Sequence, residues 1–388
     1  MNKSKNILVI SPFFYPEPIG TGKFNTSIVE ELNKKGHKVT ILCFHPFYPK
    51  WKSEKNEEKI EGVKIIRGGK NIFYSKKTFF RRIILEISFA FFVLRKLRKH
   101  QKNKDIIIPV FPPSFAFYCI LFFINKKIKK VGMIHDLQEI YSFNNKGIFY
   151  KIINFFIHII EKKCYNSCNK LIFLSNEIKT EAKKLYKLES VNLEVQYPFI
   201  SLVDKLTNNL NNILKPENIN IVYSGALGEK QNPNELYKIF NFLSNKIENT
   251  VFHFFSQGEI FNRLKDENLN QKIKFHDLVS KENLGELYKK SDVQILPQLA
   301  GTSKGSLPSK LPNILVSGCK VLVITDKNSE IDSLFKRLKL TKIINSWNRD
   351  IILQGLKDLL NLKQDQTLQI KAAKDLFTID KMINKILN

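Results

Sequence analysis

Two loops of this sequence combine glycines and lysines in patterns that could bind a phosphate group. The first of them, YSGALGEKQNP at 223–233, follows a predicted strand and contains Gly225, Gly228 and Lys230. Glycines allow a ligand to approach the backbone amides, and a lysine before a helix adds positive charge, so this loop could hold a diphosphate. Such loops are common, and this one alone says little about function.

The second loop leads into a helix that we predict at 309–317. Glycines and small polar residues fill 298–307, and Pro308, Ser309 and Lys310 follow. Proline suits the first turn of a helix, where its missing N–H costs nothing. Free amides at the start of the helix, the hydroxyl of Ser309 and the ammonium of Lys310 could therefore face one anion. An ordinary capped helix with a surface lysine is the alternative.

The chain opens with a βαβ pattern that lacks a dinucleotide fingerprint. Residues 6–10 are a short apolar run typical of a buried strand, 24–35 have helical spacing, and 37–43 form a second predicted strand. Where G-x-G-x-x-G would be expected, the sequence reads PFFYPEPIGTG, and its only glycines are Gly20 and Gly22. The unit therefore does not hold a dinucleotide in the usual way.

Length and pattern together predict two α/β domains. The 388 residues suffice for two domains of ordinary size, each with its own core. A polar, asparagine-rich segment at 197–218 resembles a linker, and strand and helix patterns restart beyond it. We expect Rossmann-like domains at 1–200 and 217–375, and a C-terminal helix at 376–388 that could pack back on the first domain.

The net charge of +27 indicates an anionic partner: a phosphate-bearing ligand, nucleic acid or an anionic membrane. An AT-rich genome would produce part of the same bias. Residues 76–104 hold ten lysines or arginines and one acid, Glu86. They also carry one apolar helical stripe, formed by Phe80, Ile84, Ile87, Phe91 and Leu94. This is either a core helix with a solvated basic face or a helix on anionic lipid, and the aromatic, basic stretch at 147–163 favours lipid.

Residues 106–124 contain no charge and are long enough on paper to span a bilayer. Their prolines instead predict a strand ending near Val110, a turn and a helix of about three turns, which is too short to cross a membrane.

The cysteines indicate a reducing compartment. There are five, with no C-x-x-C pair and no signal-peptide pattern before them, so we expect a cytoplasmic protein. Cys164 and Cys168 are four residues apart on a predicted helix, and we interpret them as packing residues because no further metal ligands are evident.

In their order along the chain, these segments resemble the retaining glycosyltransferases of family 4, which have the GT-B fold. The resemblance covers about residues 6–335 and is strongest to the colanic-acid and O-antigen branch, which builds bacterial surface polysaccharides. The specific blocks are FYPEPIGTGKFNTSIVEELNKKGHKVTIL near the start and PSKLPNILVSGCKVL at 308–322. Supporting blocks are RRIILEISFAFFV, MIHDLQE, LSNEIKTEA, YSGALGEKQNP and DVQILPQ. The resemblance implies two Rossmann-like domains facing across a cleft.

The resemblance also implies roles for the glycines and lysines. The opening loop would line the cleft, where Gly20 and Gly22 would let the backbone approach a nucleoside-diphosphate sugar donor. Lys230 matches the lysine that commonly contacts the donor diphosphate. Ala226 replaces the arginine often found in that loop, and Lys310 is the candidate for the missing charge. Gly225, Gly228 and Ser309 would complete the donor-binding set.

Three departures from the family pattern stand out. The paired glutamates, eight residues apart, read Gly305 and Asn313 here, although Asn313 can still hydrogen-bond a ribose hydroxyl. His135 and Asp136 match the position where the family keeps a polar residue near the donor sugar; a turn with a satisfied histidine is the alternative. The Trp-Pro that often follows in this branch is replaced by Gln138 and Glu139.

The implied reaction is transfer of a hexosyl or N-acetylhexosaminyl group, with retention, to a polyprenyl-diphosphate-linked saccharide. We expect no cofactor and no metal, because the chain has no D-x-D motif. The protein would lie peripherally on the inner face of the cytoplasmic membrane and bind no nucleic acid. Two other functions remain open: a sugar-nucleotide 2-epimerase of the same fold, and a non-enzymatic nucleic-acid-binding protein driven by charge.

Overall fold

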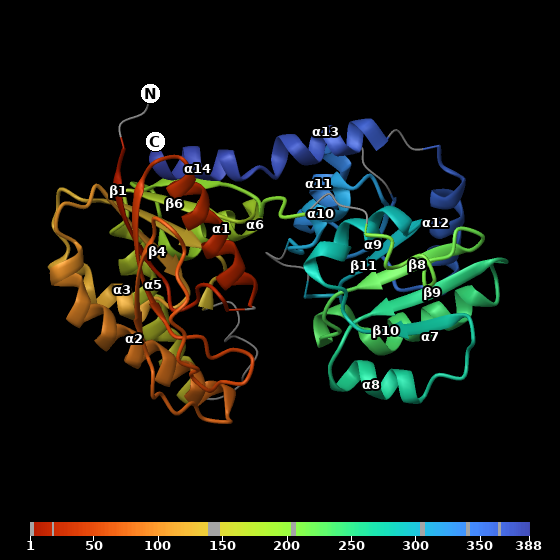
Figure 1. Ribbon diagram of the computed structural model, residues 1–388, viewed down its shortest axis with the longest axis horizontal. Coiled ribbons are helices and arrows are strands. Elements are labelled where there is room, and N and C mark those ends of the chain that lie inside the picture. The colour runs from red at the N-terminus through yellow and green to blue at the C-terminus, as the bar shows by residue number, and fades with distance from the viewer. Residues whose placement is uncertain are drawn as a thin grey trace. The chain divides into compact units, whose positions relative to one another are not determined.

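The computed structural model (Figure 1) describes residues 4–17, 19–138, 148–202, 207–302, 307–338, 342–363 and 366–388. The chain separates into two compact units. The first unit comprises Met1–Tyr197 and Ile379–Asn388, and the second comprises Pro198–Thr378. Each unit is built on its own parallel sheet flanked by helices, so the predicted pair of Rossmann-like α/β domains is confirmed.

Among the described residues, the first unit contains a seven-stranded parallel sheet in the order β3-β2-β1-β4-β5-β6-β7. Its strands are β1 Asn6–Ile10, β2 Lys38–Phe44, β3 Lys64–Gly68, β4 Ile106–Phe111, β5 Lys129–Ile134, β6 Lys170–Phe173 and β7 Asn192–Val195. The strand order reverses between β1 and β4, which pair in parallel. At such a point the loops after the two strands leave in opposite directions, and open sheets bind ligands there.

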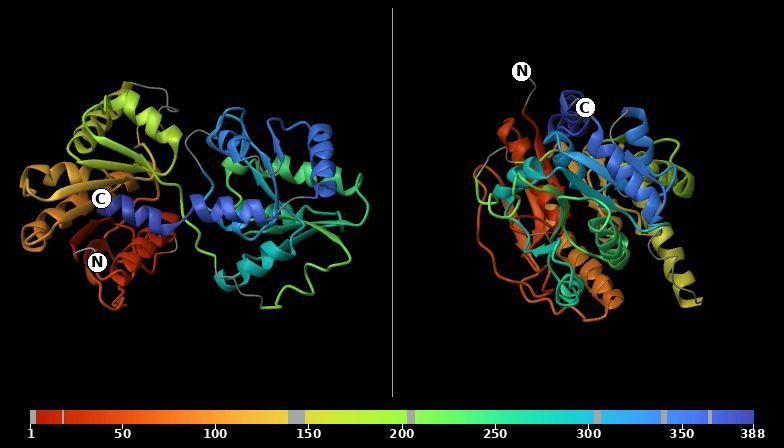
Figure 2. Two further views of the ribbon diagram at one scale, coloured as in Figure 1. Left: turned by 90° about the horizontal axis from the view of Figure 1, so that it is seen from above. Right: turned by 90° about the vertical axis from the view of Figure 1, so that its right-hand side faces the viewer.

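Helices cover both faces of this sheet. They are α1 Gly20–Lys34, α2 Thr78–His100, α3 Phe115–Ile120 with the 3₁₀ turn η1 Leu121–Phe123, α5 Ile148–Asn166, α6 Asn176–Tyr186 and α14 Ile379–Leu387. Side chains of α2, α3, α5 and α6 share one buried cluster with the strands. Because crossovers between parallel strands are right-handed, α1 lies on the opposite face, and it packs beside α14 (Figure 2).

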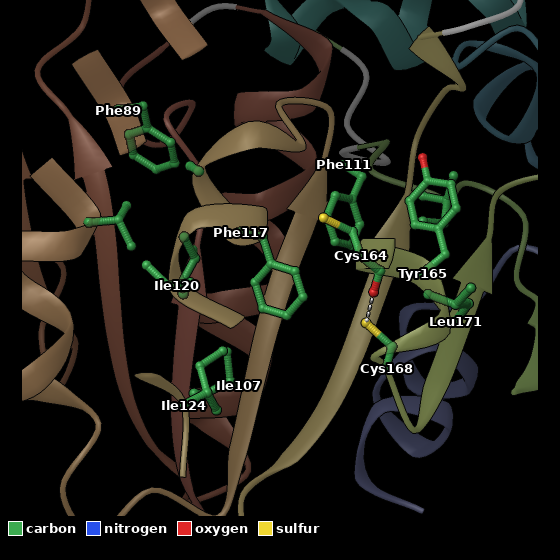
Figure 3. Close-up of a cluster of buried hydrophobic side chains, with 14 of the residues drawn as sticks. Phe89, Ile107, Phe111, Phe117, Ile120, Ile124, Cys164, Tyr165, Cys168 and Leu171 are labelled. Atoms are coloured by element: carbon green, nitrogen blue, oxygen red, sulfur yellow. Dashed lines mark hydrogen bonds between the residues drawn. The ribbon is translucent and has the colours of Figure 1, made fainter. Parts of the chain in front are cut away.

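The buried cluster of the first unit includes the two neighbouring cysteines (Figure 3). Cys164 and Cys168 are both buried, and the Sγ of Cys168 lies 3.4 Å from the carbonyl oxygen of Cys164. Aromatic rings surround them: Phe111 meets Phe117 and Tyr165 edge to face. The interpretation of both cysteines as packing residues is confirmed.

Helix α2 has two apolar sides. Leu85, Phe89, Val93 and Leu97 are buried in the cluster. The stripe noted in the sequence lies on another side, where the side chains of its members Phe80, Ile87, Phe91 and Leu94 are between 38% and 61% exposed. Helix α2 is therefore a core helix, as one alternative held, but the stripe is not the line of side chains that meets the sheet. The spacing of apolar residues in the sequence indicates one stripe along the helix, whereas the structure shows that a second stripe faces the sheet.

The uncharged segment 106–124 is divided as expected. The strand β4 ends at Phe111, and the predicted three-turn helix is shorter, since α3 has six residues and is followed by the single turn η1. None of the helices in the described part of the chain has the length and apolar character needed to span a membrane.

Three lysines at the amino ends of strands hold the carbonyl end of α14. Their ammonium groups donate to its last carbonyl oxygens at 2.5 to 2.9 Å, joining Lys5 to Leu387, Lys129 to Asn388 and Lys170 to Lys385. Carbonyls in the last turn of a helix have no intrahelical donor and form the negative end of its dipole. The lysines satisfy both requirements and fix the C-terminal helix to the first unit.

The second unit repeats the architecture with a six-stranded parallel sheet among its described residues, in the order β10-β9-β8-β11-β12-β13. The strands are β8 Ile219–Ser224, β9 Thr250–Phe255, β10 Ile273–His276, β11 Val293–Pro297, β12 Lys320–Ile324 and β13 Lys342–Ile344. The helices are α7 Pro233–Ser244, α8 Glu259–Asp266, α9 Leu284–Lys290, α10 Leu311–Val316, α11 Glu330–Leu338, α12 Arg349–Asn361 and α13 Gln366–Leu376, with 3₁₀ turns η2 Glu229–Gln231 and η3 Lys281–Asn283.

Two histidines lie side by side on β9 and β10. The Nδ1 of His253 is 3.1 Å from the Nε2 of His276, and the Nε2 of His253 is 3.2 Å from the Oδ1 of Asn220. Burial lowers the pKa of His253 to about 3 and that of His276 to about 4. Both rings are therefore neutral in the folded unit at neutral pH.

This pair predicts a loss of stability in acid. Below about pH 6.5 the unfolded chain takes up protons that the folded unit cannot accept, so the free energy of unfolding should fall until about pH 3, the lower of the two folded-state pKa values. The substitution His276→Gln removes one of the two groups and should make that fall shallower. Urea unfolding of both proteins across this pH range measures the two slopes, and equal slopes would contradict the assignment.

Candidate functional site

The side chain of Lys310 joins the two glycine-containing loops of the second unit. Lys310 immediately precedes α10, and its Nζ donates a 2.6 Å hydrogen bond to the carbonyl oxygen of Ser224, the last residue of β8. The same ammonium lies 4.3 Å from the centre of the Tyr223 ring. Gly225 has a φ of +125°, and a Cβ built there would lie 3.6 Å from the Lys310 Nζ. A glycine therefore turns the chain directly beside the ammonium.

Among the described residues, the Lys310 ammonium contacts neutral groups. Burial alone lowers its pKa to about 7, and the carbonyl oxygen and aromatic face that it contacts are both neutral groups. A lysine in such surroundings gains from any anion that approaches, because the anion restores the stabilisation that water would give. Tyr223 contributes to this environment, and sequence reasoning missed it because the ring belongs to a strand that reads as ordinary core.

Lys230 belongs to the loop after β8, which also contains Gly225, and it contacts the loop after β11. Its carbonyl oxygen accepts a 2.7 Å hydrogen bond from the amide of Leu299, just after β11, and its side chain is exposed. The loops after β8 and β11 are thus in direct contact through both lysines. This brings together Gly225, Lys230 and Lys310 at the carboxyl edge of the sheet, as expected for a ligand site in a parallel sheet.

The expected free amides of this loop are already engaged. The amide of Gly225 donates to the carbonyl of Phe255 at 2.9 Å, and that of Gly228 donates to the Oε1 of Gln231 at 3.0 Å. The expectation that both amides stand open to a ligand is therefore wrong for this conformation. Positive charge in the loop comes from side chains.

The helix near Pro308 begins later than predicted. Helix α10 spans Leu311–Val316 and not 309–317, so Pro308 and Ser309 lie in the turn before it and Lys310 is its N-cap residue. The expectation that Pro308 occupies the first helical turn is wrong; Pro312 stands near the start instead. Ser309 is exposed at this turn. Gly305 lies outside the described residues.

Asn313 has a structural partner. It is buried on α10, its Oδ1 accepts a 2.8 Å hydrogen bond from the amide of Ser201, and its Nδ2 lies 3.3 Å from the Ser201 hydroxyl oxygen. Ser201 belongs to the segment that we interpreted as a linker. The side chain expected to bind a ribose hydroxyl thus holds the start of the second unit in this structure.

In the first unit, Gly20 and Gly22 belong to the first turn of α1 and not to a loop, since α1 begins four residues before the predicted helix. A Cβ at Gly20 would meet nothing within 4 Å, so its backbone is open to an approaching group. A Cβ at Gly22 would lie 2.9 Å from the Cβ of Glu17. Gly22 is therefore required by internal packing.

Glu17 fixes the opening loop, a role that the sequence did not reveal. Its buried carboxylate accepts hydrogen bonds from the amides of Phe47 and Tyr48 at 3.2 and 2.5 Å, joining the loop after β1 to the loop after β2. Burial raises the pKa of Glu17 to about 7, and the two amides oppose that rise. The prolines around it gave the only signal that this loop has a defined shape.

His135 and Asp136 follow β5, also at the carboxyl edge of the first sheet. The amide of His135 donates to the carbonyl of Phe111 at 2.9 Å, and its ring meets the ring of Phe24 on α1 edge to face, with ring centres 4.9 Å apart. The Nε2 of His135 is buried and has no hydrogen-bond partner among the described residues, and burial lowers the pKa of His135 to about 4. The described residues thus do not satisfy that nitrogen, and both interpretations of His135 stay predictions.

No cluster of three or more His, Cys, Asp or Glu side chains suited to a metal ion occurs among the described residues. The site residues are divided between the units: Gly20, Gly22, His135 and Asp136 in the first, and the other six in the second.

Two family descriptions match the chain in succession. Residues 19–203 match Glycosyltransferase Family 4, and residues 207–375 match Glycosyl transferases group 1. The chain is 23% identical to WcaI of Escherichia coli (strain K12), named for glycosyl transfer in colanic acid biosynthesis, over 98% of both proteins.

Solved structures show the same fold. The glycosyltransferase WaaG of lipopolysaccharide biosynthesis superposes with a TM-score of 0.68 at 14% identity, covering 98% of this chain and 99% of WaaG. Sucrose-phosphate synthase from Thermosynechococcus elongatus gives a TM-score of 0.70 at 11% identity, covering 98% and 97%. The chain belongs to the family 4 glycosyltransferases and has the GT-B fold.

Proposed function

We propose that the protein transfers a hexosyl or N-acetylhexosaminyl group from a nucleoside-diphosphate sugar to a polyprenyl-diphosphate-linked saccharide, with retention of the anomeric configuration. The product would serve synthesis of a bacterial surface polysaccharide, of the capsule, O-antigen or exopolysaccharide type. The similarity to WcaI over nearly the full length supports this class of pathway. The observation that carries the proposal is the Lys310 ammonium at the carboxyl end of β8.

The chemistry requires positive charge at one place. Departure of the nucleoside diphosphate leaves negative charge on its β-phosphate and oxocarbenium character on the sugar, and groups fixed before the reaction stabilise such charge best. We assign this role to Lys310 and Lys230. His135 and Asp136 would steady the donor sugar. The leaving diphosphate would take the acceptor proton on the same face, so we assign no protein nucleophile.

Incubation with a panel of nucleoside-diphosphate sugars tests the proposal. Release of nucleoside diphosphate should require the lipid-linked acceptor. Conversion of the donor sugar without any acceptor would contradict transfer and would favour an epimerase.

The acceptor is proposed to lie at a membrane that the first unit contacts. Three neighbouring elements carry exposed large apolar side chains, which we term the exposed apolar face: Phe80, Ile83, Ile87, Phe91 and Leu94 of α2, Phe122 and Phe123 of η1, and Ile152, Phe155, Phe156 and Ile159 of α5. α2 packs on α3, and α3 on α5. Cations accompany the rings: the guanidinium of Arg95 lies 5.6 Å from the centre of Phe91, and the ammonium of Lys163 lies 5.2 Å from that of Phe122. Apolar side chains among cations suit an anionic lipid surface.

The pKa of Lys310 predicts how turnover depends on pH. Lys310→Ala should lower kcat about 10²-fold, the order seen when one group that stabilises a transition state is removed. In the wild type, kcat/KM for the donor should fall above about pH 7 as free Lys310 loses its proton. Lys310→Arg keeps its charge and should abolish that fall, whereas Lys230→Arg should preserve it. An unchanged pH profile in Lys310→Arg, or near-normal turnover in Lys310→Ala, would remove Lys310 from the site.

The two lysines also predict that transfer needs no divalent metal. Lysines at the diphosphate do the electrostatic work that Mg²⁺ does elsewhere. Transfer should persist in excess EDTA, and Lys230→Ala should be impaired and not rescued by added Mg²⁺. Loss of activity in EDTA that Mg²⁺ restores would contradict this assignment of the diphosphate site.

Membrane binding should be peripheral and partly electrostatic. Each lysine or arginine near an anionic surface contributes about 1 kcal/mol, so high salt should release the protein from anionic vesicles, and neutral vesicles should bind it poorly. The double variant Phe91→Asp/Phe155→Asp should bind anionic vesicles much more weakly in a sedimentation assay. Leu269→Asp/Ile351→Asp is the matched control, since both side chains are exposed apolar residues of the second unit. Equal binding of the two double variants would refute the membrane face.

A further inference from the structure

Two carboxylates, the half-buried Glu86 and the fully buried Glu161, accept hydrogen bonds from Gln138, three residues after His135. The Nε2 of Gln138 donates a 2.7 Å hydrogen bond to the Oε1 of Glu86 on α2, and the Gln138 amide donates at 3.2 Å to the Oε1 of Glu161 on α5. Gln138 is one of the two residues that replace the Trp-Pro often found in this branch; the other, Glu139, lies outside the described residues. At the position where this branch often has the Trp-Pro pair, this chain therefore has a glutamine that is hydrogen-bonded to two carboxylates.

Both carboxylates are held firmly from other directions. The second oxygen of Glu86, Oε2, accepts a 3.0 Å hydrogen bond from the amide of Phe115 at the start of α3. Glu161 is fully buried, and it accepts the hydroxyls of Tyr165 and Tyr186, each at 2.6 Å. Each is an acceptor fixed in the core, and Gln138 is the point where the two meet.

The loop 135–138 is thereby held at both ends. At its start, the amide of His135 donates to the carbonyl of Phe111 at the end of β4. Leu137 is buried in the core of the first unit. At its end, Gln138 is bound by helices α2 and α5. His135 carries the first attachment, and Asp136 lies between it and the second. Neither residue can move far unless one of these hydrogen bonds breaks.

We propose that Glu86 and Glu161 are positioning residues, which act through Gln138 to keep His135 and Asp136 in place for sugar transfer. This inference rests on the proposed function for the role of His135 and Asp136. The hydrogen bonds themselves do not depend on it. A buried carboxylate that loses its donor pays a desolvation cost, so the network resists displacement of the loop.

The test is Gln138→Met, which keeps the length of the side chain and removes the donor to Glu86. The matched control is Gln101→Met, since Gln101 also donates a side-chain hydrogen bond within the first unit, at 2.9 Å to the carbonyl of Phe123. Gln138→Met should lower kcat roughly 10- to 100-fold with little change in the donor KM, because small misplacements at a site have effects of that order. Gln101→Met should leave kcat unchanged. Glu86→Gln, which alters the acceptor and spares the loop sequence, should reproduce part of the loss in kcat.

A second measurement does not depend on activity. Amide hydrogen exchange of the peptide that covers 133–138 should be about 10-fold faster in Gln138→Met than in wild type, and unchanged in Gln101→Met. If exchange and kcat of Gln138→Met both match the control, the positioning inference fails while the proposed function stands. If the wild type transfers no sugar, the proposed function fails, and the exchange experiment still decides whether the network holds the loop.

Discussion

The contact between the Lys310 ammonium and the carbonyl end of β8 joins the start of α10 to the first glycine-containing loop of the second unit. The ammonium of Lys310 faces a carbonyl oxygen and a tyrosine ring. These groups stabilise its charge less than water would, and its pKa is therefore lowered. The lost stabilisation is restored when an anion arrives. Gly225 allows the close approach, and the contact of Leu299 with Lys230 holds the second loop beside the first. The amides of Gly225 and Gly228 serve the fold, so the positive charge of this region comes from side chains.

In the first unit, three carboxylates join loops and helices that are far apart in the sequence. Glu17 joins the loops after β1 and β2, while Glu86 and Glu161 join α2, α3 and α5 to the loop after β5. Each is an acceptor for amides or hydroxyls that would otherwise be unsatisfied in the core. Helices α2 and α5 are shared by three tasks, because they pack on the sheet, carry these carboxylates and present the exposed apolar face. A substitution that alters one of these three roles can therefore affect the other two roles of the same helix.

Strand positions and the two-unit architecture could be predicted from the sequence, because buried parallel strands are short apolar runs and the loops that follow them are distinctive. Lys310 and Lys230 could be proposed for the same reason. Long-range partners could not be predicted: the contacts of Asn313 with Ser201 and of Gln138 with Glu86 join residues 112 and 52 positions apart. Periodicity also failed on α2, where two apolar lines run along one helix and spacing does not say which of them meets the sheet. The start of α10 could not be predicted from Pro308, because proline is found both in the first turn of a helix and in the turn that precedes a helix.

The lysines that grip α14 have a consequence for synthesis on the ribosome. The first unit is discontinuous, since residues 379–388 complete it after the whole second unit has been made. Lys5, Lys129 and Lys170 are translated early, whereas their hydrogen bonds to the carbonyls at the end of α14 can form only after residues 379–388 have been made. The nascent first unit therefore lacks these hydrogen bonds while the second unit is translated.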